Sequence, residues 1–192
     1  MKIYIFASRE INKESSEKIR NLRITTNDFV VLCNEPSDNS VKYLFQEKYK
    51  NRLIDFRFLR GHPHQLNDDY SIRLKNDFNH RHTEYYISEA DHLDKILKIN
   101  KIRGKIIHDL KNIEQHNNEY LNEPDRYRKL GVKYDGNLRP SIGFIAAKLM
   151  RLRFPNSKIY LCGFTFEMNG LFHDSEFEKN HLLNDNENYF II

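Results

Sequence analysis

The stretch DFVVLCNEPSD, residues 28–38, sets the expectation for the fold. Its apolar run Phe29–Cys33 predicts a buried strand, and Asn34 and Pro36 in the polar segment that follows predict a turn. The beginning of the chain has the same order, because the apolar run KIYIFAS (2–8) precedes a charged stretch with helical spacing at 14–23. A strand followed by an amphipathic helix is the repeating unit of an α/β fold.

Further apolar runs predict strands, and the amphipathic stretches between them predict helices. Strands are expected at residues 53–59, 85–88, 105–108 and 158–162, and helices at residues 41–49, 89–99, 110–120 and 142–153. Residues 60–84 lack a clear period and predict an irregular insertion. The whole pattern predicts one α/β domain over residues 1–192, with a mainly parallel sheet and helices on both faces. Ligands are expected beyond the carboxyl ends of its strands.

The composition is that of a folded chain with a mild basic excess. The chain has 192 residues, 39% of them hydrophobic, and a net charge of +4. This excess suits a phosphorylated ligand, an anionic membrane surface or a nucleic acid, and does not choose among them. Because no apolar run approaches the roughly 20 residues of a membrane helix and the start does not resemble a signal peptide, we expect a cytoplasmic protein. Cys33 and Cys162 lie in apolar runs and are expected to be buried, reduced thiols.

The second informative stretch is RPSIGFIAAKLM, residues 139–150. Pro140 and Ser141 predict a helix start, and Gly143 falls in its first turn. The unpaired N–H groups and positive dipole end of such a start can bind a phosphate, to which Arg139 adds a guanidinium. The same residues also fit plain capping with tight packing, so both interpretations stay open.

A third stretch, GLFHDSEFEKNHLL (170–183), predicts a histidine just before a helix. Asp174 or Ser175 can cap this helix, and Ser175 with Glu178 fits the capping-box pattern. The positive helix end disfavours an imidazolium, so we expect His173 to be neutral near pH 7 and able to act as a general base. The alternative is that His173 is a surface residue and Glu178 only closes the capping box.

These three stretches, in this order, resemble the sialyl motifs of the sialyltransferases of glycosyltransferase family 29. DFVVLCNEPSD resembles the large motif, and RPSIGFIAAKLM with the later IYLCGFTF resembles the small motif. FHDSEFEKN resembles the very small motif, HxxxxE, which here runs from His173 to Glu178. The bacterial sialyltransferases of family 42 show the same general arrangement more distantly.

The resemblance implies a Rossmann-like fold, the GT-A-like variant of sialyltransferases. It also implies an inverting transfer of sialic acid, or a related acidic sugar such as a keto-deoxy sugar, from a CMP donor to a glycan acceptor, with no metal or other cofactor. His173 would be the base and Glu178 a supporting residue, while the donor would be bound by Ser8, Asn34, Arg139, Ser141, Gly143 and Gly163. Two features depart from the family: Ser8 stands where the first strand usually ends in Asn, and the aromatic third motif has room only at residues 165–172.

Parts of the sequence also fit functions other than glycosyl transfer. The chain could be a nucleotide-, phosphate- or nucleic-acid-binding protein without catalysis, but we expect no strand face on which aromatic and basic residues alternate, as a nucleic-acid surface would require. Four histidines in the insertion could bind zinc: His62, His64, His80 and His82. The basic segment RYRKLGVK (126–133) is expected to be a solvated surface with room for a peripheral contact with acidic lipid at the inner face of the membrane.

Overall fold

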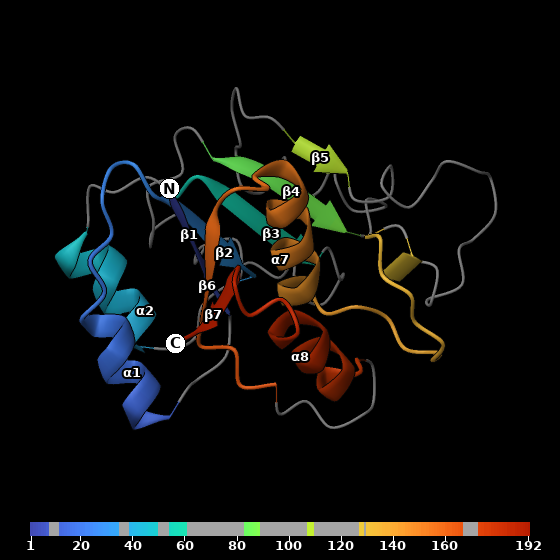
Figure 1. Ribbon diagram of the computed structural model, residues 1–192. Coiled ribbons are helices and arrows are strands. Elements are labelled where there is room, and N and C mark those ends of the chain that lie inside the picture. The colour runs from blue at the N-terminus through green and yellow to red at the C-terminus, as the bar shows by residue number, and fades with distance from the viewer. Residues whose placement is uncertain are drawn as a thin grey trace.

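The computed structural model describes residues 1–7, 12–34, 39–49, 54–60, 83–88, 107–109, 127–128, 130–166 and 173–192. These residues form a seven-stranded sheet of order β5-β4-β3-β2-β1-β6-β7, in which every neighbouring pair is parallel (Figure 1). The strands are β1 (Lys2–Phe6), β2 (Phe29–Cys33), β3 (Phe56–Arg60), β4 (Glu84–Ser88), β5 (Ile107–Asp109), β6 (Lys158–Cys162) and β7 (Tyr189–Ile191). The predicted Rossmann-like α/β fold is confirmed.

The described helices are α1 (Lys13–Arg20), α2 (Asn39–Tyr43), the π-helical turn η1 (Leu44–Lys48), α7 (Ile142–Arg153) and α8 (Ser175–Leu183). The helix expected at 41–49 is therefore split. The N–H of Tyr49 donates to the carbonyl of Leu44 (2.6 Å), which is a five-residue spacing. The Tyr49 hydroxyl is also held between the Leu22 carbonyl (2.9 Å) and the Ile24 N–H (3.0 Å). The contacts of the Tyr49 hydroxyl are tertiary, and helical periodicity does not reveal them.

Helices cover both faces of the sheet, as expected (Figure 1). Alternate residues of a strand point to opposite faces, so Ile3 and Ile5 of β1 pack in the cluster that contains α7, whereas Tyr4 and Phe6 pack in the cluster that contains α1 and α2. The cluster with α7 also contains Leu182 of α8. Both faces of the central strands are therefore buried, which explains their continuous apolar runs.

The order in which strands are added to the sheet changes direction at β1. Strands β2 to β5 are added on one side of β1, and β6 and β7 on the other. In an open parallel sheet, the carboxyl ends of the strands at such a switch point are the usual ligand site. Helices α7 and α8 each precede a parallel strand, so their N-termini lie at this same carboxyl edge.

The helices predicted at 89–99 and 110–120 lie outside the described residues, as does nearly all of the insertion predicted at 60–84. The strands at 29–33 and 158–162 and the helix at 142–153 have the predicted bounds. Strand β7 was not predicted, although the apolar run YFII (189–192) was a signal for it.

Two surface predictions are wrong. The segment 126–133 is not simply solvated, because Tyr127, Leu130 and Val132 are buried in the core. Basic and aromatic residues do alternate on one strand face, because Lys2 and Tyr4 of β1 pair in register with Lys158 and Tyr160 of β6.

The two cysteines are buried, as predicted. Cys33 packs in the cluster on the α7 side of the sheet, and Cys162 packs in the cluster on the opposite side. Burial raises the pKa of the Cys33 thiol to about 12 and also raises the pKa of Cys162, so both thiols are protonated and inert at neutral pH. Within the described ranges, the helices are too short or too polar to cross a membrane.

Candidate functional site

Helix α7 begins at Ile142, and Ser141 is its N-cap. The Ser141 Oγ accepts the N–H of Phe144 (3.1 Å), which satisfies one of the first-turn donors. Gly143 lies against the ring of Phe164, the residue that follows β6 and Gly163: a Cβ at position 143 would lie 2.6 Å from Cε1 of that ring. Close approach to an aromatic ring is therefore the physical reason for a glycine in this turn.

Helix α8 is capped by Asp174 and not by Ser175. The Asp174 Oδ1 accepts the N–H of Phe177 (3.0 Å), and the Tyr134 hydroxyl donates to Oδ2 (3.2 Å). The predicted capping box between Ser175 and Glu178 is therefore wrong. Asp174 brings a negative charge to the helix N-terminus, which the dipole favours.

The side chain of Glu178 reaches across to the start of α7 instead. Its Oε1 accepts the backbone N–H of Ser141 (2.6 Å) and the hydroxyl of Tyr127 (2.9 Å), and its Oε2 accepts the Ser141 hydroxyl (2.6 Å). The residue is only 3% exposed. Three donors around a buried carboxylate compensate for its lost hydration and join the two helix starts.

The Glu178 carboxyl group is buried and surrounded by hydrogen-bond donors. Burial raises the pKa of Glu178, and the hydrogen bonds from Ser141 and Tyr127 oppose this rise. Burial and the neighbouring Glu178 carboxylate raise the pKa of Tyr127, so that its hydroxyl remains a donor at any ordinary pH. With three donors facing it, we assign the ionised form to Glu178 at neutral pH.

His173 lies beside the same segment and is 5% exposed. Its Nδ1 is 2.9 Å from the carbonyl oxygen of Arg139, two residues before the α7 cap. Because a carbonyl can only accept, this contact assigns the proton of a neutral ring to Nδ1 and the lone pair to Nε2. A backbone carbonyl that orients a histidine through Nδ1 is a common arrangement for general bases.

The structure thus brings together four of the predicted site residues, namely His173, Glu178, Arg139 and Ser141. Both donors of Ser141, its N–H and its hydroxyl, are engaged by Glu178, so a phosphate could reach them only by displacing this carboxylate. The N–H groups of Ile142 and Gly143, in the first turn of α7, have no intrahelical acceptor. A ligand at the helix start would meet these groups.

Asn34 and Gly163 lie at the same carboxyl edge, and Ser8 lies outside the described residues. Asn34 follows β2 in a left-handed conformation (φ 50°), with its N–H donating to Phe58 (2.7 Å) and its carbonyl accepting from the guanidinium of Arg57 (2.8 Å). Gly163 follows β6 with φ 74°, a value that favours glycine.

Sequence reasoning missed Tyr127. Its hydroxyl donates to Glu178, and its ring packs edge-on against Phe177 (5.4 Å between centroids, 88°) and Phe144 (5.4 Å, 62°). A signal was present: apolar and aromatic residues recur through the basic segment and directly after it, at Tyr127, Leu130, Val132 and Tyr134, and such recurrence is typical of a buried stretch.

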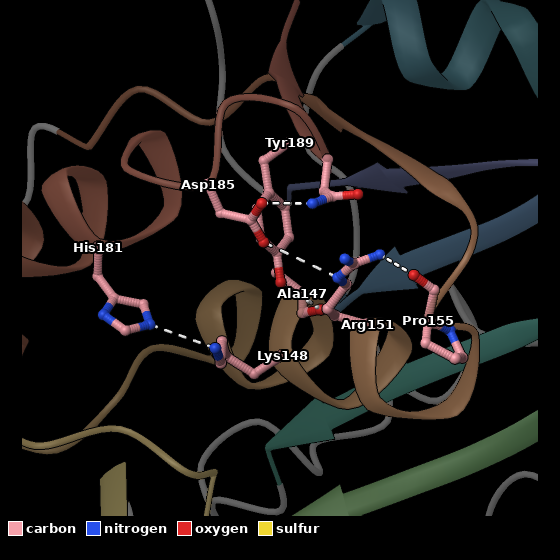
Figure 2. Close-up of polar contacts among 8 residues, drawn as sticks. Ala147, Lys148, Arg151, Pro155, His181, Asp185 and Tyr189 are labelled. Carbon is pink, nitrogen blue, oxygen red and sulfur yellow. Dashed lines mark hydrogen bonds and ion pairs between the residues drawn. The ribbon is translucent and has the colours of Figure 1, made fainter.

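A second set of contacts joins α7 and α8 further along (Figure 2). The Nζ of Lys148 lies 3.2 Å from Nε2 of His181, and Arg151 pairs with Asp185 (3.8 Å). Burial, followed by the neighbouring Lys148, lowers the pKa of His181, and burial also lowers the pKa of Lys148. A neutral His181 can accept a hydrogen bond from the Lys148 ammonium, which holds the helices together at this point.

The zinc hypothesis concerns His62, His64, His80 and His82, which all lie outside the described residues. Among the side chains that the structure does describe, no group of three or more His, Cys, Asp or Glu residues could hold a metal ion.

Comparison with known proteins returns no relative. No family model matches the chain, and neither a curated protein nor a solved structure is significantly similar to it.

Proposed function

We propose that the protein is a glycosyltransferase that moves sialic acid, or a related acidic sugar, from a CMP donor to a glycan acceptor. The reaction would invert the anomeric centre and need no metal. The observation that carries the proposal is that His173 and Glu178, the two ends of the HxxxxE stretch, both bind the backbone of residues 139–141 at the start of α7. The resemblance to three ordered sialyl motifs predicts that these segments work together.

In the proposed reaction, Nε2 of His173 takes the proton of an acceptor hydroxyl. The hydroxyl oxygen forms a bond to the anomeric carbon while the bond from that carbon to the CMP phosphate oxygen breaks. CMP leaves with the electron pair, and the proton remains on the imidazole. The Arg139 carbonyl, which accepts from Nδ1, stabilises the imidazolium that forms.

The departing phosphate gains negative charge, which the start of α7 is suited to stabilise. The positive end of the helix dipole and the first-turn N–H groups of Ile142 and Gly143 are fixed before the reaction and need little reorganisation. Arg139 adds a guanidinium on the same segment. Glu178 acts as a positioning residue, because its carboxylate ties the α8 start, and with it His173, to this helix tip.

A second candidate function is nucleotide or phosphate binding without catalysis. The observation that favours it is the low exposure of His173, 5%, because a base must reach the acceptor hydroxyl. The Ser8 and third-motif departures from the family pattern point the same way. In this case the His173 contact would only fasten the segment before α8 to the segment before α7.

The first experiment tests binding and catalysis separately. We expect CMP to raise the melting temperature, with AMP and oligonucleotides having little effect, and we expect a panel of CMP-sugars to show release of CMP. His173→Ala should lower this release at least 100-fold while CMP affinity changes less than about threefold. His181→Ala, which removes a histidine near the end of α8 and away from the α7 start, is the matched control and should retain activity.

The outcomes separate the two candidates. CMP binding without release of CMP from any donor would favour the binding protein. Full turnover by His173→Ala would exclude His173 as the base, and a melting temperature that is insensitive to CMP would exclude both candidates in their CMP form.

A further inference from the structure

Four basic side chains lie over four aromatic rings on the side of the sheet that α1 and α2 cover. The pairs, with distances from the cation to the ring centroid, are Lys2 over Tyr160 (5.8 Å), Arg20 over Tyr43 (5.4 Å), Lys48 over Tyr49 (5.4 Å) and Lys158 over Phe190 (5.6 Å). We call these eight residues, together with Tyr4 and Arg23, the basic–aromatic face. Its sequence signature is the repeated Lys-Ile-Tyr that opens β1 and β6.

Direct contacts connect the strand part of this face. The rings of Tyr4, Tyr160 and Phe190, on the neighbouring strands β1, β6 and β7, form a stack with centroids 5.1 and 5.2 Å apart and interplanar angles of 22° and 24°. The Tyr4 hydroxyl donates to the carbonyl of Arg23 (3.4 Å), which links the stack to the turn after α1.

The helical part is joined to the same turn. The Lys48 ammonium donates to the carbonyls of Arg20 (2.8 Å) and Leu22 (2.9 Å), and the Tyr49 hydroxyl donates to Leu22 (2.9 Å). The end of α1 therefore lies between the two groups of pairs. The turn after α1 thus connects the four pairs, with Tyr4 buried beneath it.

This surface is positively charged and lies far from the candidate site in the topology. Its basic residues are exposed, namely Lys2, Arg20, Arg23, Lys48 and Lys158. Of the described acids beside it, Asp28 is buried and its carboxylate accepts from the Lys2 N–H and from Thr25, while Glu17 is exposed one turn before Arg20 on α1. Lys2 and Lys158 begin their strands, so the charges gather at the amino edge of the sheet, whereas His173 and the α7 start lie at the carboxyl edge.

We propose that the basic–aromatic face docks the protein on an anionic membrane surface. Lys and Arg side chains are attracted to acidic lipid headgroups, and half-buried Tyr side chains suit the boundary between headgroups and acyl chains. Tyr43 is 42% exposed beside Arg20 and can enter that boundary. Docking at the amino edge would leave the carboxyl edge, where the candidate site lies, in solution. The membrane proposal therefore does not depend on the proposed function.

A single-stranded nucleic acid is the other polyanion that combines basic and aromatic contacts. It needs ring faces on which bases can stack. Here Tyr160 is stacked between Tyr4 and Phe190. A basic side chain already lies over each of the other three rings, those of Tyr43, Tyr49 and Phe190. Exposed charge with covered ring faces therefore favours lipid phosphate over nucleobases.

The test is cosedimentation of the full chain with vesicles. We expect binding to phosphatidylcholine vesicles that contain about 30% phosphatidylglycerol, little binding to pure phosphatidylcholine, and weakening as salt is raised from 0.05 to 0.5 M. Removing two charges with Lys2→Ala and Lys158→Ala should lower the partition coefficient about 25-fold, since each basic residue near the surface contributes roughly a factor of five.

Lys133→Ala is the matched control, because it removes a charge from the basic segment 126–133 and should change binding less than twofold. The Ala variants change only exposed side chains, and an unchanged melting temperature would show that they fold. Equal binding to both kinds of vesicle, or an equal loss in Lys133→Ala, would overturn the proposal. So would binding to an oligothymidine that depends on Lys2 and Lys158 while vesicle binding is absent, because this would identify the face as a nucleic-acid surface.

Discussion

The starts of α7 and α8 are capped in the same way but are embedded differently. Ser141 and Asp174 each accept the N–H three residues on, at 3.1 and 3.0 Å. At α7, the cap residue is itself held by the buried Glu178 through two further bonds, whereas at α8 the cap carboxylate also accepts the hydroxyl of the half-buried Tyr134. The comparison shows that a capping motif predicts where a helix begins, while the acid three or four residues later can serve a different helix.

Of these changes, Glu178→Ala should lower the stability of the protein most. It leaves the Ser141 donors and the Tyr127 hydroxyl without their acceptor in a buried site, which should cost about 3 kcal/mol of unfolding free energy. Denaturant titration measures the loss. Glu178→Gln should lie between Ala and the wild type, because one carbonyl oxygen keeps two of the three bonds while the amide faces the Ser141 hydroxyl as a second donor. A Gln variant as stable as the wild type would contradict the ionised assignment.

The two caps should respond unequally to truncation. Ser141→Ala removes the α7 cap and one donor to a buried carboxylate, so we expect a loss of about 2 kcal/mol. Asp174→Ala removes a partly exposed cap from α8 and should cost about 1 kcal/mol of unfolding free energy. Thermal unfolding of both variants, monitored by circular dichroism, provides the comparison. Equal losses would mean that the Glu178 contact adds nothing to the α7 cap.

Tyr127 and Tyr134 each donate a hydroxyl hydrogen bond to an acid in the first turn or cap of α8, Glu178 and Asp174 respectively. Tyr127→Phe should cost about 1.5 kcal/mol, because a buried hydroxyl bonded to a carboxylate is lost. Tyr134→Phe removes a longer bond (3.2 Å) at a half-buried site and should cost less than about 0.5 kcal/mol. Urea midpoints of the two variants measure this, and the opposite order would show that burial does not strengthen the Tyr127 contact.

The smallest effect should come from pH at the far end of the α7–α8 contact. The folded-state pKa of His181 is below its unfolded value, so the folded protein binds fewer protons, and stability should fall as pH drops below about 6.5. The charged groups that act on the pKa of this ring are Lys148, which lowers it, and Asp185, which raises it and is paired with Arg151. Because the ring is partly exposed, we expect well under 1 kcal/mol.

The control for this effect is His181→Gln, which cannot titrate in this range. Melting temperatures measured between pH 5 and pH 8 should fall more steeply in acid for the wild type than for the variant. Parallel curves would rule out the contribution of His181.

Much of the central fold could be read from periodicity. Strand β2 and residues 159–162 of β6 are mostly buried and therefore carry uninterrupted apolar runs, and α7 has a clear buried stripe. Strand β7 was not read, although it lies in the short apolar run YFII (189–192). The role of Tyr127 could not be read either, since basic neighbours surround it in the sequence and its partner lies 51 residues away.

Strand and helix order, the parallel sheet and the cap at Ser141 follow from the sequence alone, because backbone geometry and the burial of alternating or helical stripes are local properties. The direction in which Glu178 points, the tautomer of His173 and the gathering of Lys2 and Lys158 beside stacked rings were decided only by the tertiary structure. Each of these depends on a partner that chain order does not bring near. A buried polar group takes whichever donor or acceptor the packing of helices and strands puts within about 3 Å.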